Sequence, residues 1–410
     1  MSVRYFDDSW KKTVYCGKVC SSQEGQPVVL NGWLRKRRDL GGIIFLELWD
    51  HTGTVQVVFN PEGTPDVHER AKDLRSEYVI SVKGTMRRRP AGTENPGLPT
   101  GEWEVLAEDL LVLSPSSPLP FEMGEVDRVD ENLRLKYRYL DLRRPRMQEN
   151  LRIRARAASF TRSFLGRHGF LEVETPILTK STPEGARDYL VPSRVNQGEF
   201  YALPQSPQLF KQILMVSGCD RYFQIAKCFR DEDLRADRQP EFTQVDLEMS
   251  FITETDIINL LEAYVKGLFS EILSEGIETP FLQLTWKEAM EKYGSDKPDL
   301  RIPMEICDLD RIFANSGFEP FRKILEEGGA VRGLRVPGGA SFSRKDLSEW
   351  EERAKALGGK GLASFQLKGG ELKGPLAKTL DDEGKGGLIG SSWLQEGDVL
   401  FVAAGDWLQT

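Results

Sequence analysis

The segment 222–251 carries the pattern that most restricts how this chain can fold. Two stretches of alternating polar and apolar side chains, 222–229 and 242–251, flank a loop rich in arginine, aspartate and glutamate, 230–241. Because successive side chains of a β-strand point to opposite faces of a sheet, alternation with a period of two indicates strands. The segment therefore predicts an antiparallel hairpin with one apolar face and one polar face.

The return strand of this hairpin is expected to present two chemically different faces. Its buried face should carry Thr243, Val245, Leu247 and Met249. Its other face should carry Phe242, Gln244, Asp246 and Glu248, beside Tyr222, Gln224 and Arg230 from the first half of the hairpin. A solvated edge strand would show the same polar period. A ring, an amide and an arginine on one wall also suit a nucleotide, since arginine binds phosphate bidentately.

Residues 27–113 show a second set of short strands separated by turns. About five strands in this length predict a small antiparallel barrel of the OB type. Alternation within 43–60 places Phe45 and Gln56 on the face away from the barrel core. An exposed aromatic ring beside an amide and the basic run 35–38 is typical of barrels that stack single-stranded bases. A packing face against another domain would explain the same residues.

The remaining segments predict a linker, two helices and a further mixed unit. The Pro- and Ser-rich stretch 114–121 indicates a domain boundary, and the charged stretch 131–146 indicates a hinge. Apolar residues at helical spacing predict a helix over 153–164. Ser206 as N-cap and Pro207 in the first turn predict a second helix. Residues 334–367 predict strand, helix and strand in an independent α+β unit.

Composition excludes several other classes of protein. No apolar run approaches the ~18 residues of a membrane span, and the N-terminus lacks the apolar core of a signal peptide. A net charge of −8 argues against indiscriminate binding of nucleic acid through bulk charge. Of the five cysteines only Cys16 and Cys20 form a close pair, with no second pair to complete a metal site. We therefore expect reduced cysteines and a cytoplasmic protein.

Several long motifs, in one consistent order, resemble those of class II aminoacyl-tRNA synthetases, and specifically the bacterial-type aspartyl-tRNA synthetases. FRDEDLRADRQPEFTQVDLEMSF resembles motif 2, and GFLEVETPIL is similar to motif 1. STPEGARDYLVPSR is similar to the mobile loop over the amino-acid pocket, and LPQSPQLFKQILM to the aspartate-recognition helix. GWLRKRRDLGGIIFLELWD resembles the anticodon-binding barrel and LKYRYLDLRRP the hinge.

This resemblance implies an α+β multidomain fold. An OB-fold anticodon-binding domain would occupy residues 1–115, and a hinge or linker residues 116–150. The N-terminal part of a class II antiparallel-sheet catalytic core, with motifs 1 and 2, would occupy residues 151–303. YGSDKPDLR and the Gly-rich unit after it resemble the inserted α+β domain of the bacterial aspartyl enzymes, expected over residues 304–410.

The resemblance also assigns candidate site residues. Aspartate binding falls to Glu184, Ser206, Gln208, Lys211, Arg230, Gln244 and Asp246. ATP binding falls to Arg230, Asp231, Glu232, Gln239 and Phe242. Anticodon binding falls to Phe45, Gln56, Glu104 and Arg37, and Pro176 would lie at a dimer interface.

The implied reaction is that of an aspartate–tRNA ligase, which forms aspartyl-adenylate from L-aspartate and ATP and transfers the aspartyl group to the 3′ end of tRNA. Implied partners are ATP, Mg²⁺, L-aspartate, tRNA and a second copy of the chain. Lys211 would choose the substrate, because a pocket that selects a carboxylate needs a fixed cation. This choice disfavours asparaginyl and lysyl relatives. The sequence leaves open whether the asparagine tRNA is charged as well as the aspartate tRNA.

One family feature is not found in the sequence. Class II enzymes carry a third motif, a Gly-rich strand that leads to an Arg-bearing helix. Neither VPGGASF nor GGLIGSSW matches it, so the chain is expected to stop within the inserted domain, with the magnesium ligands beyond its C-terminus. Residues 1–410 alone are then expected to be inactive, which keeps open the alternative of a synthetase fragment that acts at most as a tRNA-binding module.

Overall fold

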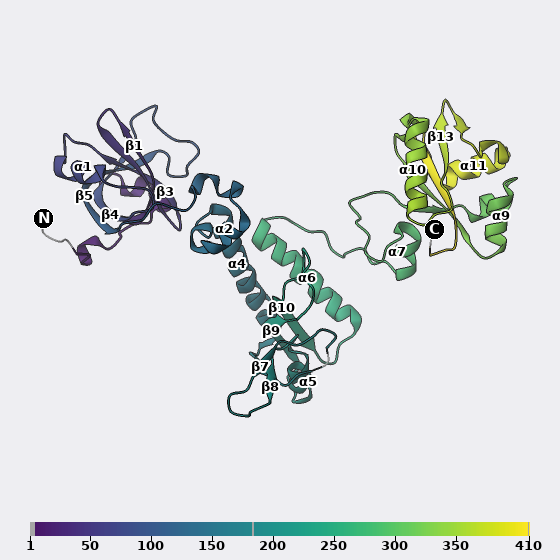
Figure 1. The fold of residues 1–410 in the computed structure, drawn as a ribbon, viewed down its shortest axis with the longest axis horizontal. Coiled ribbons are helices and arrows are strands. Elements are labelled where there is room, and N and C mark those ends of the chain that lie inside the picture. Colours follow the sequence, from purple (N-terminus) through teal and green to yellow (C-terminus); the bar gives the residue numbers. More distant parts are fainter. Residues whose placement is uncertain (1–4, 183, 409) are drawn as a thin grey trace. The chain divides into compact units, whose positions relative to one another are not determined.

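The computed structural model describes residues 5–182, 184–408 and 410. The chain divides into two compact units, Met1–Ile277 and Glu278–Thr410 (Figure 1). The contacts thus group residues 278–303 with the C-terminal unit, whereas the sequence placed a boundary after residue 303. The four predicted domain ranges stay a prediction.

The first element of the N-terminal unit is a closed five-stranded barrel with the strand order β1-β2-β3-β5-β4. Its strands are β1 Pro27–Leu40, β2 Ile43–Asp50, β3 Gly53–Phe59, β4 Val79–Arg88 and β5 Trp103–Ser114. Helix α1, Pro65–Lys72, lies in the connection between β3 and β4. The prediction of an OB-type barrel is confirmed, except that the barrel is not wholly antiparallel, since β3 and β5 pair in parallel.

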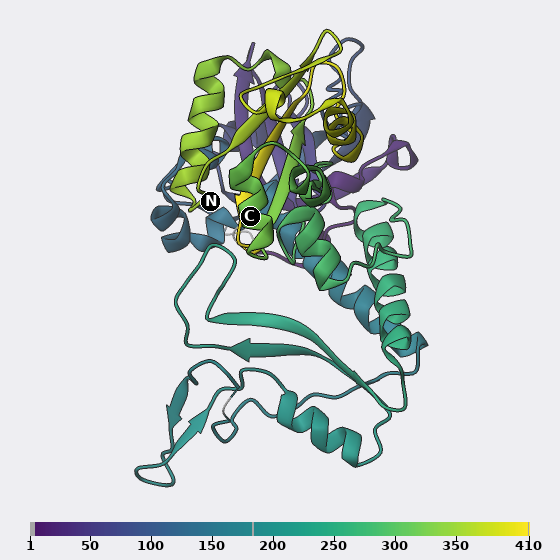
Figure 2. The same cartoon turned by 90° about the vertical axis from the view of Figure 1, so that its right-hand side faces the viewer.

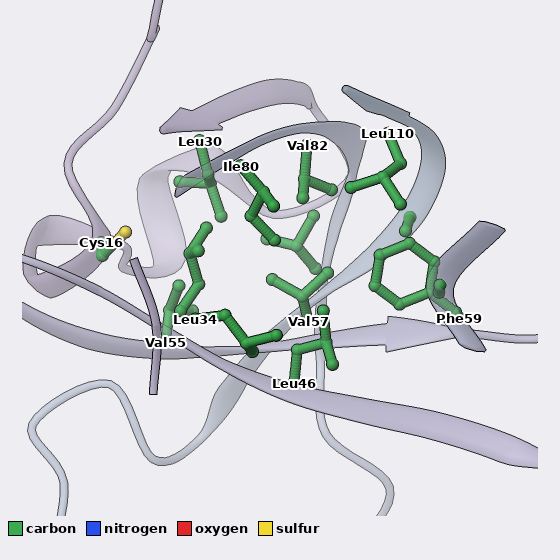
Figure 3. Close-up of a cluster of buried hydrophobic side chains, with 14 of the residues drawn as sticks. Cys16, Leu30, Leu34, Leu46, Val55, Val57, Phe59, Ile80, Val82 and Leu110 are labelled. Carbon is green, nitrogen blue, oxygen red and sulfur yellow. The ribbon is translucent and has the colours of Figure 1, made fainter. Parts of the chain in front are cut away.

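Alternating apolar side chains fill the interior of the barrel. In β2 the side chains of Ile44, Leu46 and Leu48 are fully buried. They meet apolar side chains of the other strands, among them Val57 and Phe59 of β3 (Figure 3). This interior is the face that the alternation in 43–60 predicted to be buried.

A β-bulge in β1 changes the orientation of the basic run 35–38. Leu34 pairs with Leu48, but the next pair is Lys36 with Glu47, so Arg35 has no cross-strand partner. Beyond the bulge Arg37 lies opposite Leu46 and Arg38 lies opposite Phe45. An extra residue in one strand shifts its side-chain alternation by one. Arg38, and not Arg37, therefore stands directly across from Phe45.

Short helices connect the barrel to a long helix. They are η4 Met123–Arg128, α2 Glu131–Lys136 and α3 Arg138–Asp141, and the long helix is α4 Pro145–Arg167. Asp141 is fully buried and forms ion pairs with Arg138 and Arg144. Arg143 reaches back to an ion pair with Glu77 of the barrel. None of the helices in the described part of the chain is long and apolar enough to cross a membrane.

A three-stranded sheet with the order β10-β9-β6 follows. Its strands are β6 Leu171–Glu172, β9 Arg221–Phe229 and β10 Glu241–Met249. Helices α4 and α6, Glu254–Leu273, pack on its apolar face around Phe164, Phe223 and Leu260. A small hairpin, β7 Leu190–Pro192 with β8 Phe200–Ala202, and helix α5, Gln208–Val216, lie in the connection between β6 and β9.

The prediction that the apolar face of β10 is buried along its whole length is wrong. Val245 of β10 is 42% exposed, although the alternation placed it on the buried face. Leu247 and Met249 on the same face pack against the helices. β10 is the edge strand of the sheet, and the helices reach only one end of it among the described residues. Alternation assigns a side chain to a face, but it does not tell whether another element covers that face.

The C-terminal unit is built on an antiparallel sheet with the order β11-β12-β15-β13-β14. Its strands are β11 Ile306–Asp308, β12 Ala330–Val336, β13 Ala363–Lys368, β14 Glu371–Lys373 and β15 Val399–Gly405. Its helices are α7 Trp286–Tyr293, α8 Asp310–Ala314, α9 Glu319–Glu326, α10 Arg344–Ala356 and α11 Asp382–Ser391. Strand β12, helix α10 and strand β13 confirm the predicted strand–helix–strand order.

We expect Leu46→Ala to destabilise the barrel by about 2–5 kcal/mol, because a fully buried leucine leaves a cavity when it is truncated. Leu40→Ala is the matched control, since Leu40 of β1 is 61% exposed and should change the barrel by less than about 0.5 kcal/mol. Hydrogen exchange of the β2 and β3 amides measures the change. Equal exchange rates in the two variants would contradict the predicted core.

Candidate functional site

The register between β9 and β10 assembles the polar wall. Phe242 pairs with Cys228, Gln244 with Ala226, Asp246 with Gln224, and Glu248 with Tyr222, so all eight residues share one face. The two strands and their connecting loop form the long teal hairpin in Figure 2. Tyr222 and Cys228 on this face are fully buried. The polar face is therefore buried along β9 and partly exposed along the edge strand β10.

Lys211 of α5 lies over this wall. Its Nζ donates a hydrogen bond of 2.7 Å to Oδ1 of Asp246, and Oε2 of Glu248 lies 3.3 Å away. The side chains of Lys211 and Asp246 are only 12% and 10% exposed. Burial lowers the pKa of Lys211, but the two carboxylates outweigh it and raise this pKa above its usual value. The lysine is therefore a fixed positive charge at neutral pH.

Two polar atoms of the wall have no hydrogen-bond partner among the described residues. They are Oδ2 of Asp246 and Nε of Arg230, and both are buried. A buried polar atom without a partner costs about 1–3 kcal/mol. One is an acceptor and the other a donor, so the site can bind a molecule that offers a cation and an anion.

The N-terminus of α5 lies one residue away from the predicted position. The helix begins at Gln208 with Pro207 as the N-cap, one residue later than expected. The Ser206 hydroxyl accepts a hydrogen bond of 3.2 Å from the Gln208 amide and donates one of 2.6 Å to Oε2 of Glu184. Ser206 thereby joins the candidate aspartate residue Glu184 to the start of the helix. The Gln208 side chain is exposed.

Gln205 is a site residue that the sequence analysis missed. Its side chain is 1% exposed and holds the loop in front of the wall. The amide donates to the carbonyl of Ala186 at 2.8 Å and to Oδ1 of Asp188 at 2.6 Å, and it accepts from the Ala186 amide at 3.0 Å. Its partners lie 17 and 19 residues earlier in the chain, and no local pattern marks such a contact.

The candidate nucleotide residues line a cavity of about 290 Å³ at the loop end of the hairpin. Its lining includes Arg230, Glu232, Gln239 and Phe242. The Arg230 guanidinium lies 5.1 Å from the centre of the Phe242 ring, and Glu232 pairs with Arg238 at 3.3 Å. The structure thus gathers four of the five candidate ATP residues.

The fifth candidate, Asp231, connects this cavity to the loop held by Gln205. Its amide donates to the Arg187 carbonyl at 3.0 Å, and the Arg187 side chain lies 3.7 Å from Oδ2 of Asp231. The two loops are therefore joined beside the wall. Of the remaining candidates, Gln244 is partly buried and Pro176 is exposed.

Three of the four candidate anticodon residues, Phe45, Gln56 and Glu104, lie on the outer face of the barrel, whereas Arg37 lies opposite the core residue Leu46. Phe45 is half-buried, and Gln56 and Glu104 are buried at 9% and 1% exposure. Gln56 donates to Oε2 of Glu104 at 2.8 Å, and Arg87 donates to Oε1 at 2.9 Å. Phe45 and Gln56 share this face, as the alternation predicted. Nε of Arg37 is buried without a partner among the described residues.

Two known protein families match the parts of the chain that form the barrel and the sheet. The family described as "tRNA synthetases class II (D, K and N)" matches residues 130–382. The family described as "OB-fold nucleic acid binding domain" matches residues 28–113. The chain belongs to the class II tRNA synthetases of the D, K and N group. The fold class predicted from the sequence is confirmed.

Curated relatives with high identity are aspartate enzymes by name. The "Aspartate--tRNA(Asp/Asn) ligase" of Thermodesulfovibrio yellowstonii is 53% identical over 390 residues, which cover 95% of this chain and 66% of the relative. The "Aspartate--tRNA ligase" of Exiguobacterium sibiricum is 53% identical over 391 residues, with coverage of 95% and 66%. The chain spans about two thirds of the length of these relatives.

Solved structures support the fold. The asparaginyl-tRNA synthetase of Pyrococcus horikoshii, complexed with asparaginyl-adenylate, has a TM-score of 0.57 and 27% identity, and the match covers 64% of this chain and 58% of that chain. A structure titled as an aspartyl-tRNA synthetase of Leishmania major Friedlin has a TM-score of 0.59 at 20% identity, with coverage of 67% and 55%. At that identity the second match shows the fold alone.

We expect Gln205→Ala to release the loop 184–189, because it removes three hydrogen bonds that together stabilise the loop by about 2 kcal/mol. The Asp231 amide, which bonds to this loop, should then exchange with solvent more than tenfold faster. Gln212→Ala on the exposed side of α5 is the matched control. Unchanged exchange at Asp231 in the Gln205 variant would show that the loop is held by other contacts.

Proposed function

We propose that the protein acts as an aspartate–tRNA ligase. The substrate α-carboxylate would attack the α-phosphorus of ATP and release pyrophosphate, and a hydroxyl of the terminal tRNA ribose would then take the aspartyl group and release AMP. Family membership and the names of relatives at 53% identity support the proposal. Because those relatives carry both names, tRNA(Asp/Asn) and tRNA, similarity does not decide whether the asparagine tRNA is a second acceptor.

The observation that carries the proposal is the buried charge of Lys211. Its side chain is 12% exposed on the wall where the amino acid would lie. A carboxylate side chain would add a further counter-charge to this cation beside Asp246 and Glu248, whereas a neutral asparagine side chain would add none. Because an ammonium–carboxylate contact adds a Coulomb attraction that an amide oxygen lacks, the pocket would prefer aspartate.

The two unpartnered atoms fit the other end of the substrate. Oδ2 of Asp246 would accept from the substrate ammonium group, and the Arg230 guanidinium would bridge the α-carboxylate and the α-phosphate. No protein nucleophile is needed, so catalysis would rest on positioning and on stabilisation of developing charge. The Phe242 ring, now beside Arg230, offers a flat apolar surface for adenine.

Enzymes of this class generally use ATP with Mg²⁺, and the ion neutralises phosphate charge. Groups of three or more His, Cys, Asp or Glu side chains that could hold a metal ion are not found among the described residues. We therefore assign no magnesium ligand in this chain. The residues that we assign to ATP are Arg230, Asp231, Glu232, Gln239 and Phe242.

For the barrel we propose the tRNA anticodon as the ligand. Phe45 would stack on a base, and Gln56 and Glu104 would offer an amide and a carboxylate to base edges from a fixed geometry. For the exposed Pro176 we propose a contact in a homodimer. Both proposals rest on the family assignment.

Lys211→Met tests the substrate choice, because it removes the charge and keeps most of the volume. We expect the preference for L-aspartate over L-asparagine, measured by calorimetric titration, to fall by about 3–5 kcal/mol, or about 10²- to 4×10³-fold. ATP binding should change little. Lys227→Met is the matched control on the same sheet, since Lys227 is half exposed and pairs with Glu241 at 2.8 Å. An unchanged preference would exclude Lys211 as the selecting group.

Phe45→Ala tests the base-stacking face of the barrel. We expect it to weaken the binding of an aspartate-tRNA anticodon stem–loop by about 1–3 kcal/mol, the usual contribution of one base–aromatic stack. Phe45→Trp should retain the binding because it keeps an aromatic face. If the alanine variant binds as tightly as the parent in a filter-binding titration, Phe45 does not contact a base.

A further inference from the structure

One oxygen of Asp246 has no hydrogen-bond partner among the described residues, although a donor lies beside it. Oδ1 of this carboxylate accepts from Nζ of Lys211 at 2.7 Å, whereas Oδ2 is buried and unpartnered within the same part of the chain. A buried acceptor without a partner destabilises a folded protein, and a neighbouring donor would remove this cost. The way in which the neighbouring donors are bonded therefore keeps Oδ2 available.

The neighbouring donor is the hydroxyl group of Tyr222. Tyr222 lies on the same face of the sheet as Asp246, and its side chain is fully buried. Burial raises the pKa of the Tyr222 hydroxyl group, and the nearby negative charge of Asp246 raises this pKa further. The hydroxyl group therefore keeps its proton at neutral pH, and it has a single hydrogen atom to donate.

The single hydrogen atom is donated to Gln224 and not to the carboxylate. The Tyr222 hydroxyl group donates to Oε1 of Gln224 at 2.9 Å. The Thr175 hydroxyl group, in the segment that follows β6, donates to the same oxygen at 2.9 Å. Two donors on one oxygen hold the Gln224 amide group in this orientation, with Oε1 toward Tyr222.

The register of the sheet brings Gln224 next to Asp246. The two residues pair directly across β9 and β10, and Tyr222 pairs with Glu248 two residues along the same face. Directly opposite residues of an antiparallel pair have Cβ atoms about 4.5–5.5 Å apart. A carboxylate accepts a stronger hydrogen bond than a neutral amide oxygen. Without the Gln224 amide oxygen, the Tyr222 hydroxyl group would therefore turn to Asp246.

We infer that Gln224 is a positioning residue that reserves Oδ2 of Asp246 for the ammonium group of the amino-acid substrate. By accepting the hydrogen bond from Tyr222, Gln224 keeps that hydroxyl group from occupying the carboxylate. Substrate binding then gains a charge-assisted hydrogen bond without first breaking one. The inference rests on the proposed function, in which Asp246 accepts from the substrate ammonium group. It adds a residue that acts through its neighbours and does not need to touch the substrate.

The test replaces Gln224 by methionine, which has a similar length and lacks the amide oxygen. In Gln224→Met the Tyr222 hydroxyl group should bond to Asp246, and this bond must be given up or shared when the ammonium group arrives. We expect the affinity of the full chain for L-aspartate, measured by calorimetric titration, to fall about 10- to 100-fold, the usual effect of a hydrogen bond to a charged group. Succinate, which is aspartate without its ammonium group, should bind as tightly as it does to the parent chain.

A second substitution should reverse the effect. In the double variant Gln224→Met/Tyr222→Phe no hydroxyl group is left to occupy Asp246, so the affinity for L-aspartate should return to within about threefold of the parent. Tyr222→Phe alone should change this affinity by less than about twofold, because the hydroxyl group that it removes is bonded to Gln224. If Gln224 had only a structural role, the second substitution would add to the damage of the first.

Gln148→Met is the matched control. The Gln148 amide group donates to the Leu142 carbonyl at 2.6 Å, outside the site, so this variant loses one amide hydrogen bond of similar burial. Its affinities for L-aspartate and for succinate should both equal those of the parent chain.

The outcomes separate this inference from the proposed function. If the parent chain binds L-aspartate no more tightly than succinate, Asp246 does not bind the ammonium group, and the proposed amino-acid site fails together with the inference. If the parent chain prefers L-aspartate and Gln224→Met binds it equally well, only the inference is wrong. A loss that extends to succinate, or one that Tyr222→Phe does not reverse, would also overturn the inference.

Discussion

The ladder between β9 and β10 is the constraint on which the candidate site depends. Nine consecutive residue pairs fix which side chains of the hairpin face α5. A slip of one residue would turn every side chain of β10 to the opposite face. Asp246 would then leave Lys211 and enter the apolar core around Phe223. The position of the pocket and the packing of the sheet are thus determined by the same hydrogen bonds.

The charges of the wall also explain how it stays folded without a ligand. Lys211 satisfies Oδ1 of Asp246, and Arg230 lies over Phe242. Removing one partner of a buried ion pair usually destabilises a protein more than replacing both partners by apolar residues. The wall keeps this pair and leaves two single atoms unpartnered, each at a cost of about 1–3 kcal/mol.

The features that could be predicted from the sequence are those in which polar and apolar residues repeat at a regular spacing. Alternation identified the barrel hairpin and the β9–β10 hairpin, because a strand repeats its environment every second residue. Lys211 was predicted as a pocket residue from the cap before its helix and from the family motif around it. The Ser206 cap itself was displaced by one residue, which is the usual accuracy of a helix end.

The features that escaped prediction depend on single, non-repeating contacts. Gln205 acts through one amide that bonds to a loop 17 to 19 residues away. The exposure of Val245 depends on which element covers an edge strand. The burial of Gln56 and Glu104 depends on side chains that satisfy each other across two strands. None of these contacts produces a regular residue pattern that could be recognised in a single sequence.

Because of the bulge at Arg35, the number of residues in β1 decides where each basic side chain of the run 35–38 lies. The four cations of the run 35–38 have similar side chains, yet the bulge gives each one different surroundings. Arg35 is unpaired, Lys36 lies opposite Glu47, Arg37 opposite Leu46 and Arg38 opposite Phe45. Exchanging lysine for arginine would alter little of this order. Deleting one residue of the run would remove the bulge, so the unpaired position would be lost while the rest of the strand kept its pairing.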